Sequence, residues 1–239
     1  MLYGVLSVHL LRSSASGLSA FESSLADYLS EQMILKSGRT PNPAEQRSWS
    51  RSIPALRADL MDAGLGDVEV LLEYQLPLTS KRADVVLAGR HPQTGNPSYV
   101  IVELKQWSSA EQFEDSDTLV RIEQYGDRAV THPLEQVRGY CDYVTDFIVS
   151  LADQPHELAG AAYLHNATDL GVADLFDMAP PDASLTSRMF TGQRRGDFID
   201  FLLTRLQPGA QGIDAADLLL GSKIAPSKQL LAVAADEVQ

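Results

Sequence analysis

The segment LEYQLPLTSKRADVVLAGRHPQTGNPSYVIVELKQW (residues 72–107) contains two apolar runs with charged side chains at their ends. RADVVLAG and YVIVELKQW are typical of strands, and the Gly, Pro and Asn residues of GRHPQTGNPS predict a hairpin connection between them. Side chains alternate between the two faces of a strand, so Glu103 and Lys105 point to the same face. If the RADVVLAG strand lies alongside, Asp84 reaches the same place.

This arrangement presents two carboxylates and one ammonium group together at a strand end. Carboxylate oxygens are hard ligands suited to Mg²⁺ or Mn²⁺, and a neighbouring cation favours chemistry on a phosphate. Further along, HPLEQVRGY (residues 132–140) reads as the start of a helix. Gln136 and Tyr140 are four residues apart, so they share a helix face and can both face the strand ends. The pattern favours cleavage of phosphodiester bonds.

The E-x-K triplet alone is weak evidence, because a chain of this length contains roughly one by chance. Its context makes it specific. The triplet ends an apolar run, the upstream Asp84 opens another apolar run, and a hairpin connection joins the two. The run before Glu103 is apolar on both faces, which predicts a buried strand where a charge needs a partner.

The pattern resembles the PD-(D/E)xK nuclease superfamily, and the Q-x-x-x-Y element is similar to that of its RecB-like members. The resemblance implies a restriction-endonuclease-like core, with Asp84 and Glu103 binding metal, Lys105 catalytic, and Gln136 and Tyr140 near the metal or substrate. Ala83 stands where the superfamily usually has proline. A broader resemblance is to the N-terminal region of bacterial Schlafen-like helicases, carried by AEQRSWSRSIPAL, LEYQLPLTSKRADVVLAG, VIVELKQW and HPLEQVRGYCDY.

Five other residues are candidates for this site. The superfamily often places a helix-borne acid on the metal, which implies this role for Glu45, although a glutamate there also complements the helix dipole. Two roles are open for Glu73, which either orients the site or pairs with Lys81. Arg82, Arg138 and Trp107 are candidate substrate-binding residues, and Trp107 is alternatively a packing residue, as expected for Trp49.

The charge of the chain is the main argument against nucleic-acid binding. It has 239 residues with 19 Lys and Arg against 32 Asp and Glu, a formal net charge of −13. Affinity for a phosphate backbone normally comes from clustered basic residues. A bound divalent cation would cancel negative charge locally. We therefore expect weak intrinsic affinity for nucleic acid, with a partner or a helicase motor supplying additional binding affinity.

Composition and motifs exclude several other classes. No apolar run approaches a membrane span and no clear signal peptide precedes the chain, so a cytoplasmic location is expected. The single cysteine, Cys141, excludes an internal disulfide and is expected to pack. The histidines lack the H-E-x-x-H spacing of zinc hydrolases, and no G-x-S-x-G serine-hydrolase elbow or G-x-x-x-x-G-K-[ST] ATP-binding loop is present.

The predicted order of elements is that of an α/β domain with a central mixed sheet flanked by helices. Helices are expected at 18–36, at 44–63 with Pro54 opening its second half, and at 133–150. Strands are expected at 68–76, 83–88, 99–104 and 158–167. A short helix at 169–178, a strand at 184–192 and a helix at 194–206 follow. Residues 1–207 are predicted to form the nuclease-like domain, and 208–239 a peripheral helical extension or linker toward a motor domain absent from this chain.

These observations lead to one main functional prediction and two alternatives. The main prediction is a metal-dependent nuclease, with DNA favoured over RNA as its substrate, in phage or foreign-DNA defence or DNA repair. The oligomeric state is left open, with a homodimer as one option. The first alternative is a catalytically idle module that keeps the fold and binds nucleic acid or a protein partner. The second, a small-molecule hydrolase, lacks a recognisable nucleophile.

Overall fold

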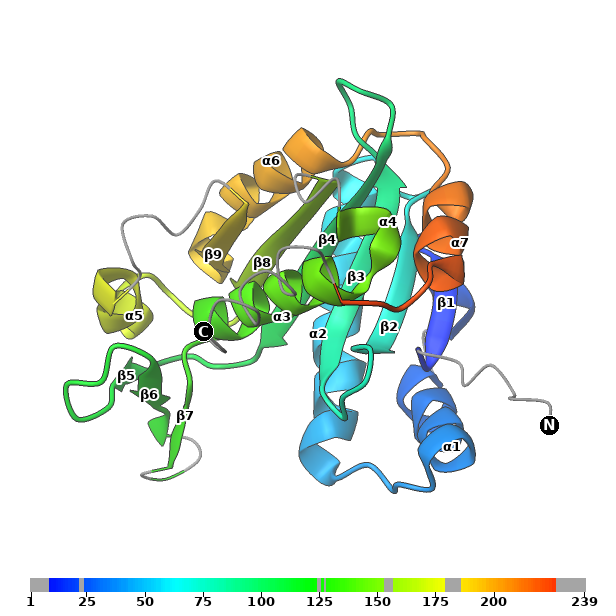
Figure 1. The fold of residues 1–239 in the computed structure, drawn as a ribbon. Helices are drawn as coiled ribbons and strands as arrows, with labels where there is room; N and C mark the ends of the chain where they lie inside the picture. The colour runs from blue at the N-terminus through cyan, green and yellow to red at the C-terminus, as the bar shows by residue number, and fades with distance from the viewer. Residues whose placement is uncertain are drawn as a thin grey trace, which may run out of the picture.

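A six-stranded mixed sheet forms the centre of the protein (Figure 1). The computed structural model describes residues 9–21, 24–123, 126, 128–152, 157–178 and 186–226. The first four strands pair antiparallel, and the last two continue the sheet parallel to the fourth. The α/β class with a mixed central sheet is therefore confirmed. In spatial order the strands are β1 (Leu11–Ser14), β2 (Glu69–Gln75), β3 (Arg82–Arg90), β4 (Pro97–Lys105), β8 (Leu158–Leu164) and β9 (Ser187–Thr191).

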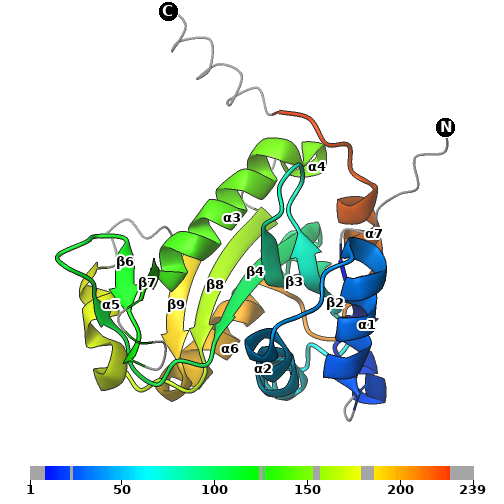
Figure 2. The same ribbon diagram turned by 90° about the horizontal axis from the view of Figure 1, so that it is seen from below.

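Helices cover both faces of this sheet (Figure 2). On one face, α1 (Leu25–Ser37), α2 (Pro43–Asp62) and α6 (Arg195–Arg205) enclose the first core. On the other face, α3 (Pro133–Phe147), α4 (Val149–Ala152) and α7 (Ile213–Gly221) enclose the second core. Alternation along β4 divides the strand between them, because Val100, Val102 and Leu104 pack in the first core and Tyr99 and Ile101 in the second. Cys141 packs at the edge of the second core, as expected.

Helix α3 packs close to the sheet because the residue that faces it on β8, Gly160, has no side chain. A Cβ at Gly160 of β8 would lie 3.0 Å from Cys141 Sγ and 3.1 Å from Val137 Cγ2. The start of α3 is set by His132, whose Nδ1 accepts a hydrogen bond from the Leu134 backbone N–H, followed by Pro133 in the first turn. These features hold α3 against the strands that carry the predicted site.

The N-terminal helices differ from the prediction in two ways. The expected helix at 18–36 is divided into a 3₁₀ helix, η1 (Gly17–Phe21), and α1, which begins only at Leu25. The expectation that Pro54 opens a separate helix half is wrong, since α2 is continuous and contains Pro54 in its interior. Its start signal lies earlier, where Asn42 caps the helix and Glu45 completes a capping box. Burial of one face of α2 compensates for the hydrogen bond that proline cannot make.

The remaining predicted elements are confirmed with small shifts at their ends. The predicted strands correspond to β2, β3, β4, β8 and β9, and the later helices to α3, α5 (Ala173–Met178) and α6. The helix expected at 133–150 is divided, because α3 ends at Phe147, Ile148 is extended, and α4 begins at Val149. Residues 184 and 185 of the expected strand 184–192 lie outside the described residues. Short 3₁₀ turns, η4 (Leu170–Val172) and η5 (Gly192–Arg194), precede α5 and α6.

Two features were not predicted. Strand β1 lies at one edge of the main sheet. The chain segment that connects β4 to α3 forms a separate small sheet of three strands, β5 (Glu111–Gln112), β6 (Leu119–Arg121) and β7 (Ala129–Thr131). We call this small sheet the β5–β7 arm.

The predicted extension at 208–239 includes α7, which packs into the second core through Ala215, Ala216 and Leu219. Residues 208–221 are therefore not peripheral, because the helix faces β3 and β4 directly. Residues 227–239 lie outside the described part of the chain. Among the helices that the structure describes, none combines the length and apolar character needed to cross a bilayer.

Candidate functional site

The ends of β3 and β4 bring Asp84 and Glu103 together. Val85 pairs with Val102 across the two strands, so Asp84 and Glu103 are the next residues along each strand. The backbone N–H of Leu104 donates a hydrogen bond to Asp84 Oδ2 at 2.8 Å, which holds the aspartate against β4. Glu103 is only 2% exposed, so its carboxylate is withdrawn from bulk water. The predicted pairing of the two acids thus has a direct structural basis.

Four of the predicted residues form one hydrogen-bond network, which we call the Glu103 network. Glu103 Oε1 accepts hydrogen bonds from Lys105 Nζ and from Gln136 Nε2, both at 2.7 Å. Lys105 Nζ also donates to Gln136 Oε1 at 3.2 Å, and Gln136 Nε2 reaches the hydroxyl of Tyr140 at 2.8 Å. Helix α3 therefore presents Gln136 and Tyr140 to the E-x-K strand, as their spacing predicted.

One oxygen of this network has no hydrogen-bond partner among the described residues. Glu103 Oε2 is buried, and nothing in the described part of the chain donates to it. A buried carboxylate oxygen left in this way costs free energy unless a proton or a cation compensates for it. With Asp84 beside it, the pair fits a Mg²⁺ or Mn²⁺ ion, which commonly takes one or two protein carboxylates and keeps several waters. Within the described residues, no three His, Cys, Asp or Glu side chains are grouped closely enough to hold an ion.

The charges of the site are strongly coupled. Burial, reinforced by Asp84, raises the pKa of Glu103 to about 8, and burial also raises that of Asp84. Burial lowers the pKa of Lys105, but the two carboxylates outweigh it and the net shift is upward. Burial and the nearby Glu103 raise the pKa of Tyr140 to about 12. Lys105 thus stays a cation, and the raised pKa values of the two acids mean that the metal-free pair keeps a proton near neutral pH, which a bound divalent cation would displace.

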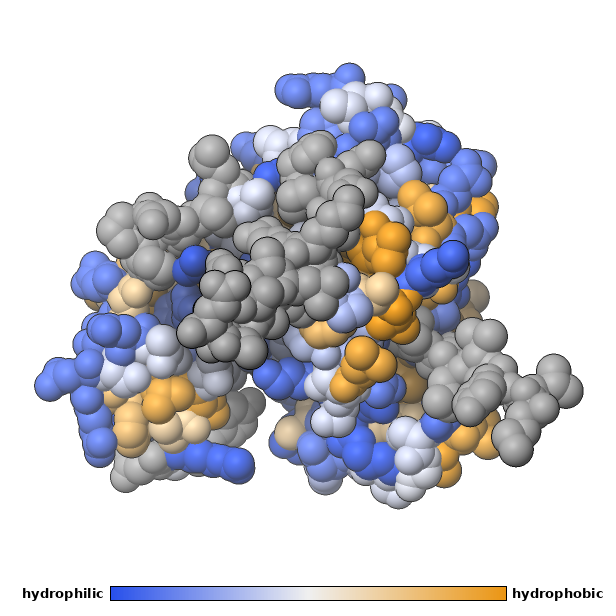
Figure 3. Space-filling model, viewed as in Figure 1, coloured by the Kyte–Doolittle hydropathy of each residue, from blue (hydrophilic) through white to orange (hydrophobic). Residues whose placement is uncertain are grey.

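The site opens into a cavity of about 940 Å³. Figure 3 shows a hollow between the lobe that contains α1 and α2 and the lobe that contains the β5–β7 arm. Asp84, Glu103 and Lys105 lie in its lining, with Val130 and Thr131 of β7 on the side of the arm. Three arginines also line the cavity, namely Arg39, Arg47 and Arg82. The cavity therefore combines an acidic interior with basic side chains near the surface.

Comparison of this chain with protein-family models, with curated proteins and with solved structures found no match.

Glu45 does not join the Asp84–Glu103 pair. It lies at the start of α2, where Glu45 Oε2 accepts a hydrogen bond from the Asn42 backbone N–H at 2.8 Å. Glu45 Oε1 forms an ion pair of 2.7 Å with Arg39. Both carboxylate oxygens are thus engaged, although the residue lines the cavity. The alternative role considered for it, stabilising the helix start, matches these contacts.

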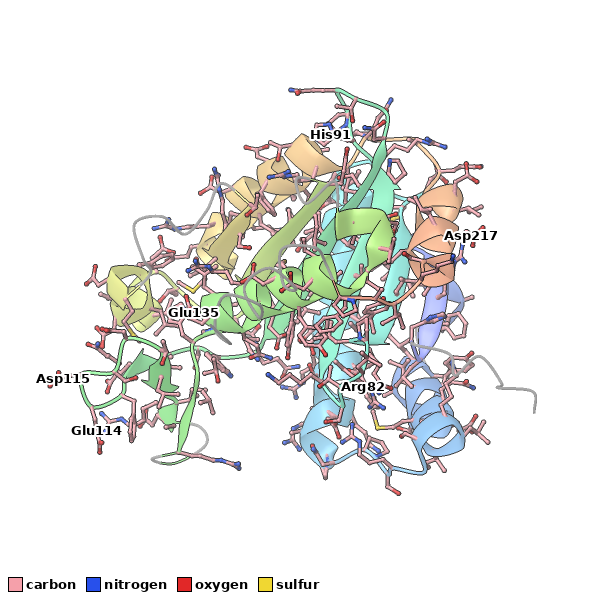
Figure 4. All side chains as sticks on the ribbon, viewed as in Figure 1. Arg82, His91, Glu114, Asp115, Glu135 and Asp217 are labelled. Carbon is pink, nitrogen blue, oxygen red and sulfur yellow. The ribbon has the colours of Figure 1, made fainter. Side chains whose placement is uncertain are left out.

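The three candidate substrate-binding residues lie in different places. Arg82 lines the cavity and lies near the lower end of β3 in Figure 4. Trp107 is buried beneath Lys105, whose Nζ lies 5.4 Å from the ring centre, so it packs in the wall of the cavity. Arg138 is paired with Glu135 at 3.0 Å and lines a second cavity near α5. Arg138 follows Gln136 by two residues on the same helix, so the side chain of Arg138 points away from the strand ends.

Sequence reasoning missed the arginines of the α2 side and the contacts of Trp49 with the site. Arg39 and Arg47 flank the start of α2, so only the packing of this helix on the sheet brings them to the cavity. Trp49 packs in the first core, as expected, and its Nε1 also donates a hydrogen bond to Glu73 Oε1 at 2.7 Å. For Arg39 and Arg47, the only sequence signal was the presence of basic residues around a helix start. For the contact of Trp49 with Glu73, the sequence carried no signal.

Proposed function

We propose that this protein is a metal-dependent nuclease that hydrolyses phosphodiester bonds of nucleic acid, with DNA favoured over RNA. The observation that carries the proposal is the buried, unpartnered Glu103 Oε2 beside Asp84, at the base of a cavity lined by arginines. The proposal includes a restriction-endonuclease-like core. The antiparallel β2–β3–β4 unit followed by α3 and the parallel strand β8 supports that assignment.

The residues divide the work of hydrolysis between them. Asp84 and Glu103 would hold Mg²⁺ or Mn²⁺, and such an ion would lower the pKa of the attacking water and neutralise charge on the phosphate. Lys105 orients the attacking water and stabilises the negative charge that develops on phosphorus-bound oxygens. The water oxygen would form a bond to phosphorus while the bond to the leaving ester oxygen breaks, with the proton of the water passing to solvent and the leaving oxygen taking a proton from solvent. Gln136 fixes the Glu103 carboxylate and the Lys105 ammonium together, and Tyr140 fixes Gln136.

The net charge of −13 lowers the affinity that such a protein can have for nucleic acid. Arg47 and Arg82 of the cavity supply local attraction, whereas Arg39 is paired with Glu45, and the field of the whole molecule opposes a polyanion. We therefore propose that a helicase motor, in the same polypeptide or as a partner, or a second copy of this chain, contributes affinity. Action in the cytoplasm, in DNA repair or in defence against phage or foreign DNA, is part of the same proposal.

A cleavage assay tests the proposal. Supercoiled plasmid, single-stranded DNA and RNA are incubated with the protein in Mg²⁺, Mn²⁺ or EDTA, and the products are separated on gels. Asp84→Asn, Glu103→Gln and Lys105→Ala should each abolish cleavage while the fold survives. Glu114→Gln, an exposed glutamate of the arm, is the matched control and should cut normally. Full activity in any of the first three variants would break the assignment.

The net charge of −13 also favours a second candidate, an idle nuclease-fold module that binds a partner. The two candidates differ in metal binding. An ion that binds only the folded state stabilises it by about 2.7 kcal/mol at one hundred times its dissociation constant. Thermal unfolding with and without Mn²⁺ separates them: a shift that disappears in Glu103→Gln supports the nuclease, and no shift supports the idle module.

A further inference from the structure

Glu73 has an unusual backbone conformation beside the candidate site. Its φ is 52°, in the left-handed region that glycine adopts readily and a glutamate does not. In β2, Leu72 pairs with Val85 and Tyr74 with Ala83, so the irregular residue sits directly between two regular pairs. Leu72 packs in the first core and Tyr74 in the second, although a regular strand would place both on one side. Backbone strain of this kind persists where the surrounding structure or a function requires it.

The strained residue places its carboxylate in the cavity of the Asp84–Glu103 pair. Glu73 Oε1 accepts the hydrogen bond from Trp49 Nε1, and Trp49 is itself buried and fixed in the first core. Within the described part of the chain, Glu73 forms no ion pair with a basic side chain. A third carboxylate is therefore held near two others, and Lys105 is the one cation that the Glu103 network contains.

The fold alone does not account for glutamate at this position. Glycine or asparagine would fit the left-handed backbone with less strain. Glutamine would also accept the Trp49 hydrogen bond, without placing another negative charge beside Asp84 and Glu103. Burial and the nearby Asp84 outweigh the Trp49 hydrogen bond and the charge of Arg82, and they raise the pKa of Glu73 to about 7, so added positive charge at the acids would favour its ionised form.

We propose that Glu73 is a positioning residue of this site, which accepts hydrogen bonds from the water molecules around a divalent cation held by Asp84 and Glu103. The inference rests on the proposed function. Direct ligation by all three acids is not supported, because the described residues contain no three-membered ligand group. Mg²⁺ and Mn²⁺ keep several waters when few carboxylates bind them, and those waters need acceptors held in fixed positions. Trp49 fixes Glu73, as Gln136 fixes Glu103.

The test measures the affinity for Mn²⁺ alone, by calorimetry and by the shift in thermal unfolding, without any nucleic acid. Glu73→Gln keeps the Trp49 hydrogen bond and removes the charge, and Glu73→Gly removes both the carboxylate and the backbone strain. Glu114 provides matched controls, because it is also a glutamate with positive φ, 47°, but lies on the β5–β7 arm away from the site (Figure 4). The same two substitutions are made there.

Both Glu73 variants should bind Mn²⁺ about 10- to 100-fold more weakly, which is the usual effect of losing an outer partner of a metal site. Without metal, Glu73→Gln should melt at the same temperature as the wild-type protein or slightly higher. Both Glu114 variants should bind Mn²⁺ normally. If Asp84→Asn abolishes Mn²⁺ binding but both Glu73 variants keep wild-type affinity, the role of Glu73 is refuted and the proposed function stands. If Asp84→Asn and Glu103→Gln also leave Mn²⁺ binding unchanged, the proposed function itself is refuted.

Discussion

At the scale of single residues, Glu103 is expected to control how stability depends on pH. In the metal-free protein its pKa rises from 4.5 to about 8, because burial and the neighbouring Asp84 disfavour the ionised form. The folded state therefore binds this proton more tightly than the unfolded state does. The stabilisation is fully present below the unfolded pKa of 4.5 and is lost as the pH rises toward about 8.

Urea denaturation in EDTA across this pH range measures the effect. The wild-type free energy of unfolding should fall as the pH rises, and Glu103→Gln should lose part of that dependence, because the raised pKa values of Glu73 and Asp84 contribute with the same sign. Adding Mg²⁺ should restore stability to the wild-type protein at the alkaline end and leave the variant unchanged. An identical pH profile in both proteins would contradict the assignment of the shift to Glu103.

The contribution of Lys105 to stability should have the opposite pH dependence from that of Glu103, because it increases as the pH rises. It is the cation that compensates Glu103 and Asp84, and removing one member of a buried ion pair commonly costs about 3 kcal/mol. Lys105→Met should therefore be destabilised by about 3 kcal/mol near pH 9, where the carboxylates are ionised, and by less in acid. Chemical denaturation of Lys105→Met with and without Glu103→Gln gives the coupling between the two, and additive losses would show that they do not interact in this way.

At the scale of elements, the close contact between α3 and β8 sets the geometry of the Glu103 network. A side chain at Gly160 would collide with Val137 and Cys141 on α3. Gly160→Val should cost about 1 to 3 kcal/mol and lift the helix, which moves Gln136 away from Glu103 and lowers cleavage. Gly139→Ala is the control on the same helix, because nothing lies within 4 Å of a Cβ there, and it should stabilise α3 by about 1 kcal/mol. Denaturation and cleavage assays on both variants test the contact.

The elements that sequence predicted well are those defined by local patterns. The apolar runs of β3, β4 and β8 and the amphipathic α3 are recognisable from local sequence alone. Locating these elements also located the site residues on them, namely Asp84, Glu103, Lys105, Gln136 and Tyr140. Strand β1 has four residues, and β5 has two, so their pairing depends on partners far along the chain. Pro54 misled the prediction because packing of α2 outweighs one missing hydrogen bond. The left-handed Glu73 had no sequence signal at all, since glutamate does not mark positive φ.

At the scale of the whole molecule, the boundary predicted at residue 207 separates α7 from the rest of the domain. Helix α7 contributes Ala215, Ala216 and Leu219 to the second core, and the Tyr99 hydroxyl donates a hydrogen bond to the Ala215 carbonyl at 2.8 Å. Two ion pairs, Arg12–Asp217 and Arg90–Asp214, join the same helix to the sheet. The contacts of α7 therefore reach three strands, β1, β3 and β4.

A chain that ends at residue 207 should consequently lose several kcal/mol of stability and expose apolar surface over β3 and β4, so that it aggregates or unfolds at moderate temperature. A chain that ends at residue 226 keeps α7 and should unfold cooperatively near the full-length midpoint. Thermal unfolding and light scattering on the two truncations distinguish these outcomes. Equal stability of both would place the domain boundary at 207, whereas loss in the shorter chain alone would make α7 an integral part of the fold that supports the Glu103 network.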